Sequence, residues 1–259
     1  LTFDLHKVYV ADQLMSMADA LVAMPTSQGA APLKAYFPQL VLPTHGRAPK
    51  PLHIIAEGIR LLRDVAPDPN PQEMRALLEE HLPTSSQRDA GRPCPEHDGG
   101  RPVMLSVGRL NPIKQQQLLV RAWARSGLAT TYDLVLIGGN PADPSSIERR
   151  MHAQIEAVLA KYPEAAVHFH LLPAMPNSQV RRLEQAIIQT RPASSPHVYV
   201  CPSVKEEFGI AVLEAMDAGF LIIGPQVGGL SSYVEPGQNG FLMDTSNAAT
   251  IAAALQEIL

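Results

Sequence analysis

Cysteine is scarce in this sequence, and this scarcity argues against several classes of protein. The two cysteines, Cys94 and Cys201, lie in a polar Pro-rich stretch and at the end of an apolar run. They form neither a disulfide framework nor a metal-ligand spacing. We therefore expect reduced thiols, no bound metal and a cytoplasmic location.

Strong net charge and long apolar runs are also lacking. The net charge is only −4, and the 21 Lys and Arg residues are scattered along the chain. Nucleic acid is therefore not an expected partner. The sequence contains no run of 18 apolar residues and no basic-then-apolar leader, so we expect neither a transmembrane segment nor a secretory signal.

The chain does contain enough apolar sequence for a sizeable core. Its 259 residues are 46% hydrophobic and 18% charged, which is ordinary for a globular protein. This length allows one large domain, or one complete domain and part of another. The chain starts at Leu1 rather than Met, and its opening residues have the pattern of a helix interior. We therefore expect a fragment of a longer protein.

A stretch rich in Pro, Gly and Ser over residues 83–102 divides the sequence into two parts. Its composition predicts a flexible linker or loop. Before it, apolar spacing predicts a helix over 10–20 and strands over 20–24 and 52–56. Residues 71–82 predict an amphipathic helix with Asn70 as N-cap and Pro71 at its first position.

Residues 103–259 alternate short apolar strands with helices. The pattern predicts an α/β fold, a Rossmann-like parallel sheet with helices on both faces. The expected strands cover 103–107, 132–137, 167–171, 197–200 and 221–224. The expected helices cover 115–126, 144–161 with Asp143 as cap, 178–189 with Asn177 as cap, 210–218 closed by Gly219, and 248–259. Ligands of such sheets bind at the carboxyl ends of the strands.

The first candidate binding segment, residues 107–114, follows the first of these strands. Gly108 lets a ligand approach the backbone, while Arg109 and Lys114 supply a guanidinium fork and a point charge suited to a diphosphate. A surface turn with two solvated cations is an equally good interpretation of this segment alone.

The second candidate segment joins the strand at 197–200 to the helix at 210–218. Free amides at the helix start suit phosphate oxygens, and the candidate binding residues there are Phe208, Gly209, Ile210 and Ala211. Glu214 can accept hydrogen bonds from ribose hydroxyls, and Glu206 can reach a sugar beyond the phosphates. Favourable negative charge near a helix start explains Glu206 and Glu207, but it does not explain a glycine at this position.

The third candidate segment contains the pair Gly228 and Gly229 after the next strand. A plain left-handed turn is the alternative. Beside the second segment, the pair predicts backbone amides that face the same crevice.

Four segments, SVGRLNPIKQ, LVLIGG, CPSVKEEFGIAVLEAMDAG and VGGLSSYVEPGQNGFLM, occur in order across about 150 residues. Together they resemble the retaining glycosyltransferases called group 1 or family 4, the relatives of sucrose-phosphate synthase, sucrose synthase and glycogen synthase. Glu206 and Glu214 have the E-x7-E spacing of that family.

The resemblance implies a transferase with two Rossmann-like domains. Residues 103–259 would bind the donor, a UDP- or GDP-sugar, and residues 1–82 would be a remnant of the acceptor domain with the interdomain segment. Arg109 and Lys114 would hold the diphosphate, Glu206 the donor sugar and Glu214 the ribose, with no cofactor and no metal required. Transfer would retain the anomeric configuration, to a sugar, lipid or small-molecule acceptor.

The sequence departs from the family at several places. Glu57 and Arg60 replace the Asn and Asp of the usual interdomain motif, and Glu207 adds a charge where a smaller or less charged residue is common. A full acceptor domain is missing, so the fragment alone is expected to be inactive. Alternatives are a non-catalytic nucleotide-sugar-binding or regulatory domain and, ranked last, a sugar-nucleotide epimerase. His168 and His170 alternate along a predicted strand, which places both on one face near the crevice and suggests a zinc site. We set this hypothesis aside because the sequence places no carboxylate or third histidine nearby.

Overall fold

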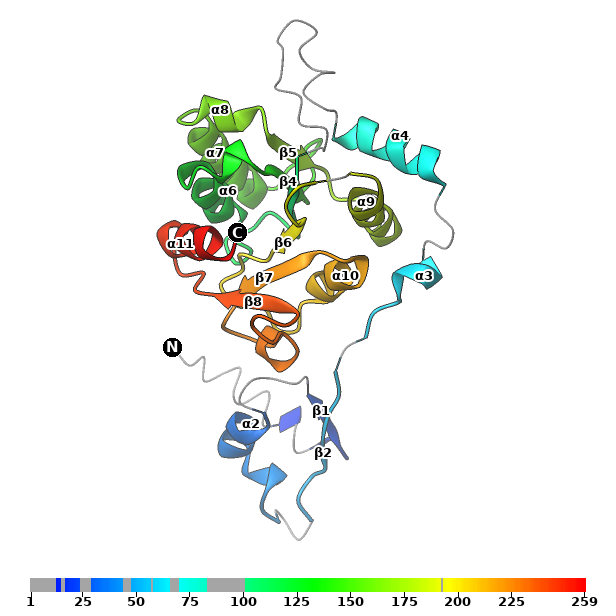
Figure 1. Cartoon of the computed structure of the whole chain (residues 1–259). Helices are drawn as coiled ribbons and strands as arrows, with labels where there is room; N and C mark the ends of the chain where they lie inside the picture. Colours follow the sequence, from blue (N-terminus) through cyan, green and yellow to red (C-terminus); the bar gives the residue numbers. More distant parts are fainter. Residues whose placement is uncertain are drawn as a thin grey trace, which may run out of the picture.

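The computed structural model describes residues 13–14, 17–23, 29–43, 48–56, 58–65, 70–82, 101–191 and 193–259. Figure 1 shows a large unit built on one sheet and a smaller part with two short strands. Residues 10–12 and 15–16 of the expected helix over 10–20 lie outside the described residues, and of the others only 13, 14 and 17 are helical. Residues 83–100 of the expected linker also lie outside the described residues. None of the helices in the described ranges combines the length and the apolar character that a membrane-spanning helix requires.

The large unit is a six-stranded, all-parallel sheet in the order β5-β4-β3-β6-β7-β8. Its strands are β3 (Val103–Val107), β4 (Asp133–Ile137), β5 (Phe169–Leu172), β6 (Val198–Val200), β7 (Leu221–Pro225) and β8 (Gly240–Met243). The chain runs outward from β3 to β5 and then returns to place β6 on the other side of β3. The direction of winding therefore reverses between β3 and β6, where such sheets bind ligands.

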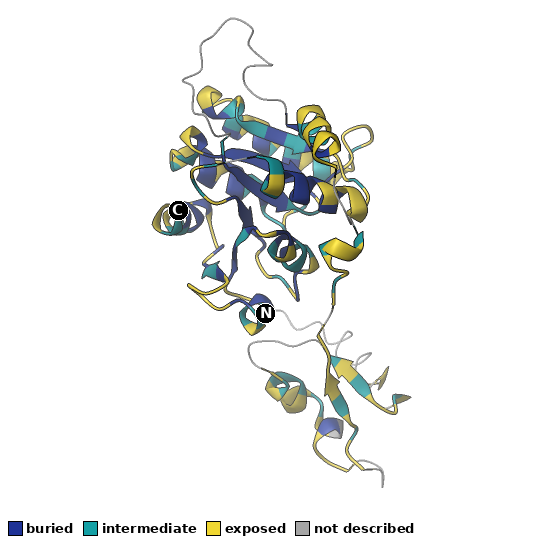
Figure 2. Cartoon of the chain, turned by 45° about the vertical axis from the view of Figure 1, so that its right-hand side comes forward, coloured by how far each residue is buried: buried dark blue, intermediate teal, exposed yellow. Residues whose placement is uncertain are grey.

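Helices cover both faces of this sheet, as the alternation predicted, and the strands between them are buried (Figure 2). On one face, α6 (Gln116–Arg125), α7 (Ser146–Leu159) and α11 (Ala248–Ile258) pack on side chains such as Met104 and Leu134. On the other face, α9 (Asn177–Thr190) and α10 (Ile210–Ala218) pack on the strand residues adjacent to these in sequence, Val103, Leu105 and Val135. Successive strand residues thus serve opposite faces, as the pleat requires.

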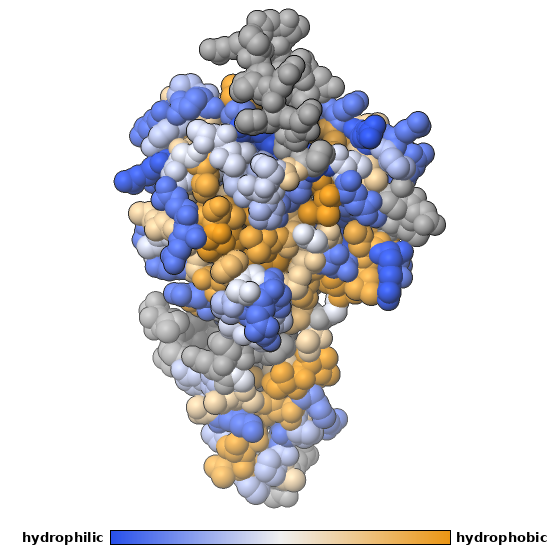
Figure 3. Space-filling view, viewed as in Figure 1, coloured by the Kyte–Doolittle hydropathy of each residue, from blue (hydrophilic) through white to orange (hydrophobic). Residues whose placement is uncertain are grey.

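The part before residue 83 has two different environments. Its parallel strands β1 (Leu21–Ala23) and β2 (Leu52–Ile54) pair next to α2 (Ala31–Tyr36), with Val22 and Ile54 exposed. Further along, α3 (Leu62–Val65) and α4 (Pro71–His81) pack against the large unit. Asn70 caps α4 by accepting a hydrogen bond from the Gln72 amide, as predicted. On the face seen in Figure 3, hydrophilic and hydrophobic residues are interspersed over the large unit.

Several local predictions were wrong. The cap of α7 is Ser145 rather than Asp143, because Ser145 and Glu148 form a reciprocal capping box. Helix α9 already includes Asn177, so that residue is not its cap. Strand β5 begins at Phe169 rather than at residue 167. The short elements α3, α8 (Pro163–Ala166) and β8 were not predicted.

The zinc hypothesis placed His168 and His170 near the crevice, and this placement was also wrong. His168 lies at the amino-terminal edge of the sheet, where its Nδ1 is 3.1 Å from a carboxylate oxygen of Asp133. Asp133 also accepts hydrogen bonds from Arg101 and Arg191. Burial by itself would raise the pKa of Asp133. The three partners stabilise the ionised carboxylate and hold this pKa well below its ordinary value. In the described part of the chain, no group of three potential ligand side chains could hold a metal ion.

Candidate functional site

A cavity of about 520 Å³ lies at the carboxyl ends of β3 and β6, at the point where the winding reverses. The loops after these two strands form its walls, together with the first turns of α9 and α10. It contains nine of the eleven residues predicted as binding or catalytic, which are Gly108, Arg109, Lys114, Glu206, Phe208, Gly209, Ile210, Ala211 and Glu214. The predicted crevice therefore exists, and the contacts of these residues with a ligand remain predictions.

The loop after β3 brings two cations to the cavity. Arg109 is exposed and Lys114 half-buried, and both line the wall. The buried Gln116 side chain fixes the loop backbone, since its Nε2 donates to the carbonyl oxygens of Gly108 at 3.2 Å and Arg109 at 2.9 Å. Gly138 permits this arrangement because a Cβ there would lie 1.9 Å from the Gly108 oxygen.

Lys114 and Glu206 form an ion pair inside the cavity, with Nζ and Oε2 2.6 Å apart. Their side chains are 28% and 16% exposed. Ser203 Oγ donates to the same carboxylate oxygen at 3.0 Å, and Cys201 Sγ lies 3.6 Å from it. Burial and the nearby Glu206 raise the pKa of Cys201 to about 11, so this thiol stays protonated. The sequence predicted separate roles for Lys114 and Glu206 but not their pairing.

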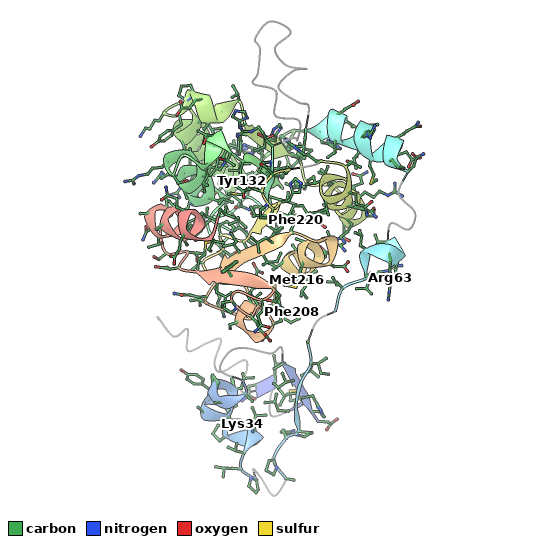
Figure 4. The ribbon with its side chains drawn as sticks, in the orientation of Figure 1. Lys34, Arg63, Tyr132, Phe208, Met216 and Phe220 are labelled. Carbon is green, nitrogen blue, oxygen red and sulfur yellow. The ribbon has the colours of Figure 1, made fainter. Side chains whose placement is uncertain are left out.

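Helix α10 begins at the cavity wall. Gly209 precedes it with φ +83°, a left-handed conformation that suits glycine. Because the helix starts at Ile210, the amides of Ile210 and Ala211 have no acceptor within the helix and can serve an anion, whereas the Val212 amide donates to the Gly209 carbonyl. Phe208, labelled in Figure 4, is buried beside Tyr233, and the Tyr233 hydroxyl donates to the Phe208 carbonyl at 2.6 Å.

Gly228 and Gly229 do not line the cavity with the other predicted residues. They lie against the Glu206–Glu207 backbone, and the Gly229 amide donates to the Glu206 carbonyl at 2.8 Å. A Cβ on Gly228 would be 2.0 Å from that oxygen, and one on Gly229 would be 1.9 Å from the Glu207 oxygen. The prediction that these amides face the crevice was wrong for Gly229. The pair instead supports the loop that carries Glu206.

Glu214 lines the cavity from the second turn of α10. The Asn177 Nδ2 donates to its Oε1 at 2.8 Å. Glu207, the unusual extra charge, has a side chain that is 69% exposed and lies 2.8 Å from Lys205 Nζ. The negative charge of Glu207 is therefore balanced by the exposed side chain of Lys205.

A buried ionic cluster lies next to Glu214. The Arg181 side chain is fully buried and donates to Glu184 Oε2 at 2.9 Å, to the Glu214 carbonyl and to Asp217. Asp217 also accepts a hydrogen bond from the Leu62 amide at 2.6 Å, which ties the segment at α3 to α10. Burial, reinforced by the carboxylates of Glu214 and Asp217, raises the pKa of Glu184 to about 8 despite Arg181.

This shift predicts a specific pH dependence of stability. The ordinary pKa of Glu184 is 4.5, so between 4.5 and about 8 the folded state holds a proton that the unfolded state has lost. The contribution of Glu184 to the free energy of unfolding is therefore fully present below 4.5 and is lost as the pH rises towards 8. We expect Glu184→Gln to remove this decline in the free energy of unfolding. Urea unfolding at a series of pH values measures it.

His197 serves as an internal reference for that experiment. Burial lowers its pKa, so its contribution rises with pH near its ordinary value of 6.5, opposite in sign to that of Glu184. His197 is unchanged in the variant, and the difference between the two proteins isolates Glu184. Parallel curves for both proteins would contradict the prediction.

Some residues of the site were not predicted as such. Asn177 was assigned to a helix cap, and neither Gln116, Ser203 nor Arg181 was singled out. The polar positions 177 and 181 are one turn apart on α9 and so share a face. That spacing was the only signal, and it could not identify the two residues because it is equally typical of a solvated helix surface.

The six-stranded parallel sheet, its reversal of winding and the helices on both faces define a Rossmann-like class of α/β domain. The model of the family described as "Glycosyl transferases group 1" matches residues 87–259. The chain belongs to this family of glycosyltransferases.

Several curated and solved proteins are similar to the chain. D-inositol 3-phosphate glycosyltransferase of Acidothermus cellulolyticus is 31% identical over 162 residues, which are 61% of this chain and 33% of that protein. Sucrose synthase 2 of Arabidopsis thaliana is 27% identical over 186 residues, 69% of this chain and 22% of that protein.

Among solved structures, sucrose-phosphate synthase of Thermosynechococcus elongatus has a TM-score of 0.65 at 24% identity, covering 98% of this chain and 52% of that one. The HepE protein of Anabaena in complex with UDP-glucose has a TM-score of 0.66 at 19% identity, covering 98% and 58%. These likenesses show the fold. The chain spans a third or less of these two curated relatives and about half of the two solved chains.

Proposed function

We propose that this chain supplies the donor-binding half of a glycosyltransferase that moves a sugar from a UDP- or GDP-sugar to an acceptor with retention of anomeric configuration. The observation that carries the proposal is the arrangement of one cavity. Arg109 and Lys114, the start of α10, and the carboxylates of Glu206 and Glu214 all line it. A nucleoside diphosphate sugar has complementary parts: two phosphates, a ribose and a hexose.

Each group has a chemical role in this proposal. When the glycosidic bond breaks, negative charge develops on the leaving diphosphate, where preorganised cations and helix amides are most effective. Arg109 offers a bidentate fork and Lys114 a point charge. The Nζ atom of Lys114 lies 2.6 Å from Oε2 of Glu206. Donor binding then places the sugar near Glu206 and the diphosphate near Lys114. The two cations let the site work without a divalent metal.

We propose that acceptor choice lies in the part of the relatives that this chain does not span, and that the chain binds donor but does not transfer sugar alone. A non-catalytic nucleotide-sugar-binding domain is the second candidate function, because it needs the same cavity. Transfer after an acceptor domain is supplied would distinguish the enzyme from the binding domain.

Calorimetric titration with UDP and GDP in the presence of EDTA tests donor binding. We expect wild type to bind one of them and the double variant Arg109→Ala, Lys114→Ala to bind it at least about 100-fold more weakly, since hydrogen bonds to charged groups contribute about 1.5–3 kcal/mol each. Arg149→Ala, Arg150→Ala is the control, because it removes two positive charges from an exposed face of α7. Equal losses in both double variants would contradict a local diphosphate site.

A further inference from the structure

Helix α9 makes two hydrogen bonds to Glu214, a residue that lines the cavity. Asn177 donates to the Glu214 carboxylate, with Nδ2 and Oε1 2.8 Å apart, and Arg181 donates to the Glu214 backbone carbonyl. Positions 177 and 181 lie one turn apart on the same face of the helix. Both ends of Glu214, its backbone and its side chain, are thus held by a single neighbouring helix.

The two contacts differ in environment. Arg181 is fully buried and also binds Glu184 and Asp217, so its contact belongs to the packing between α9 and α10. Asn177 is exposed at the cavity and lines it together with Glu214. Its amide therefore acts on the carboxylate itself at the place where a ligand would meet it.

Among the described residues, Asn177 is the one hydrogen-bond donor to the Glu214 side chain, which leaves most of the carboxylate available. An ionised carboxylate has about four acceptor positions on its two oxygens, and Asn177 occupies one of them. The remaining positions can accept hydrogen bonds from two vicinal hydroxyl groups only if the carboxylate is correctly rotated. A glutamate on a partly exposed helix otherwise loses side-chain freedom when a ligand binds, whereas the Asn177 hydrogen bond fixes the rotation beforehand.

We propose that Asn177 is a positioning residue for ribose recognition: it orients Glu214 so that the protein distinguishes ribose from deoxyribose in the nucleoside diphosphate. This inference rests on the proposed function, because it assigns Glu214 to the ribose. It adds a residue outside the E-x7-E pair and outside the α10 segment.

The test compares affinities for UDP and GDP with those for their 2′-deoxy and 3′-deoxy forms, measured by calorimetry. In wild type we expect a preference for ribose of about tenfold or more for at least one hydroxyl, as for a hydrogen bond to a charged group. In Asn177→Ala we expect this preference to fall at least about threefold, while affinity for the deoxy form stays within about twofold. Asn177→Asp should lose at least as much of the preference for ribose, because an ionised aspartate has a similar shape but cannot donate a hydrogen bond.

Gln179→Ala is the matched control, since Gln179 is an exposed amide on the same turn of α9 that does not line the cavity. It should keep the wild-type ribose preference, and thermal unfolding of Asn177→Ala should match wild type. The positioning role is overturned if wild type prefers ribose and Asn177→Ala keeps that preference, or if Asn177→Ala weakens ribose and deoxyribose forms equally. Failure of wild type to bind either nucleotide overturns the proposed function and this inference together, which is a different result.

Discussion

Arg181→Met is expected to lower the free energy of unfolding by about 3–5 kcal/mol, the cost of removing a buried cation from its ion pair with Asp217 and from its hydrogen bonds to Glu184 and the Glu214 carbonyl. The guanidinium is fully buried and shared by Glu184, Asp217 and the Glu214 carbonyl. Methionine fills much of the volume but leaves Glu184 and the Glu214 carbonyl without this donor, and Asp217 keeps the hydrogen bond from the Leu62 amide. Urea unfolding at pH 7 measures the loss.

The neighbouring position provides the control. Arg182 is exposed on the next residue of α9, and Arg182→Met should stay within about 0.5 kcal/mol of wild type. Adding Glu184→Gln to Arg181→Met should recover part of the stability, because it removes the buried carboxyl left without its donor. A loss under about 1 kcal/mol for Arg181→Met would show that water or rearranged side chains replace the guanidinium easily.

Gly228→Ala is expected to cost about 2–4 kcal/mol and to weaken binding of a nucleoside diphosphate. The new Cβ would lie 2.0 Å from the Glu206 carbonyl oxygen, so the backbone that carries Glu206 must move. The glycine also has φ +116°, which strains any other residue. Urea unfolding and calorimetric titration with UDP and GDP measure the two effects.

Gly237→Ala separates conformational strain from steric clash. Gly237 has φ +80°, but a Cβ there meets nothing within 4 Å. This variant should cost about 1 kcal/mol and leave nucleotide affinity unchanged. If Gly228→Ala behaves like Gly237→Ala in both measurements, the Glu206 loop does not depend on the close approach of the Gly228 backbone.

The sequence predicted the sheet and the cavity because both follow from local patterns. Strands β3 and β4 are short apolar runs buried on both faces, and helix α10 is closed by Gly219 as expected. Parallel strands place their carboxyl ends together, so Lys114 and Glu206 could be predicted to share one crevice. Five of the six strands of the large sheet were found in this way, with ends displaced by up to two residues.

The remaining features depend on choices that only tertiary structure makes. Asp143 and Ser145 are both good helix caps, and the partner Glu148 decided between them. Asn177 has the composition of a cap but points its amide at Glu214, a residue on another helix. Strand β8 begins with glycine and has only four residues, too few for a periodic signal. Arginine is rarely buried, so Arg181 resembles a surface residue until its acidic partners are placed around it.

Trp123 is the single tryptophan of the chain, fully buried on α6, with its Nε1 3.1 Å from the Tyr132 carbonyl. It does not line the cavity. Indole in apolar surroundings emits at shorter wavelengths than in water, so its fluorescence should shift to the red when the large sheet unfolds. Because the fluorophore lies outside the cavity wall, added nucleotide should leave its emission maximum nearly unchanged. The protein therefore carries its own optical reporter of folding, and the stability of every variant above can be followed without an attached dye.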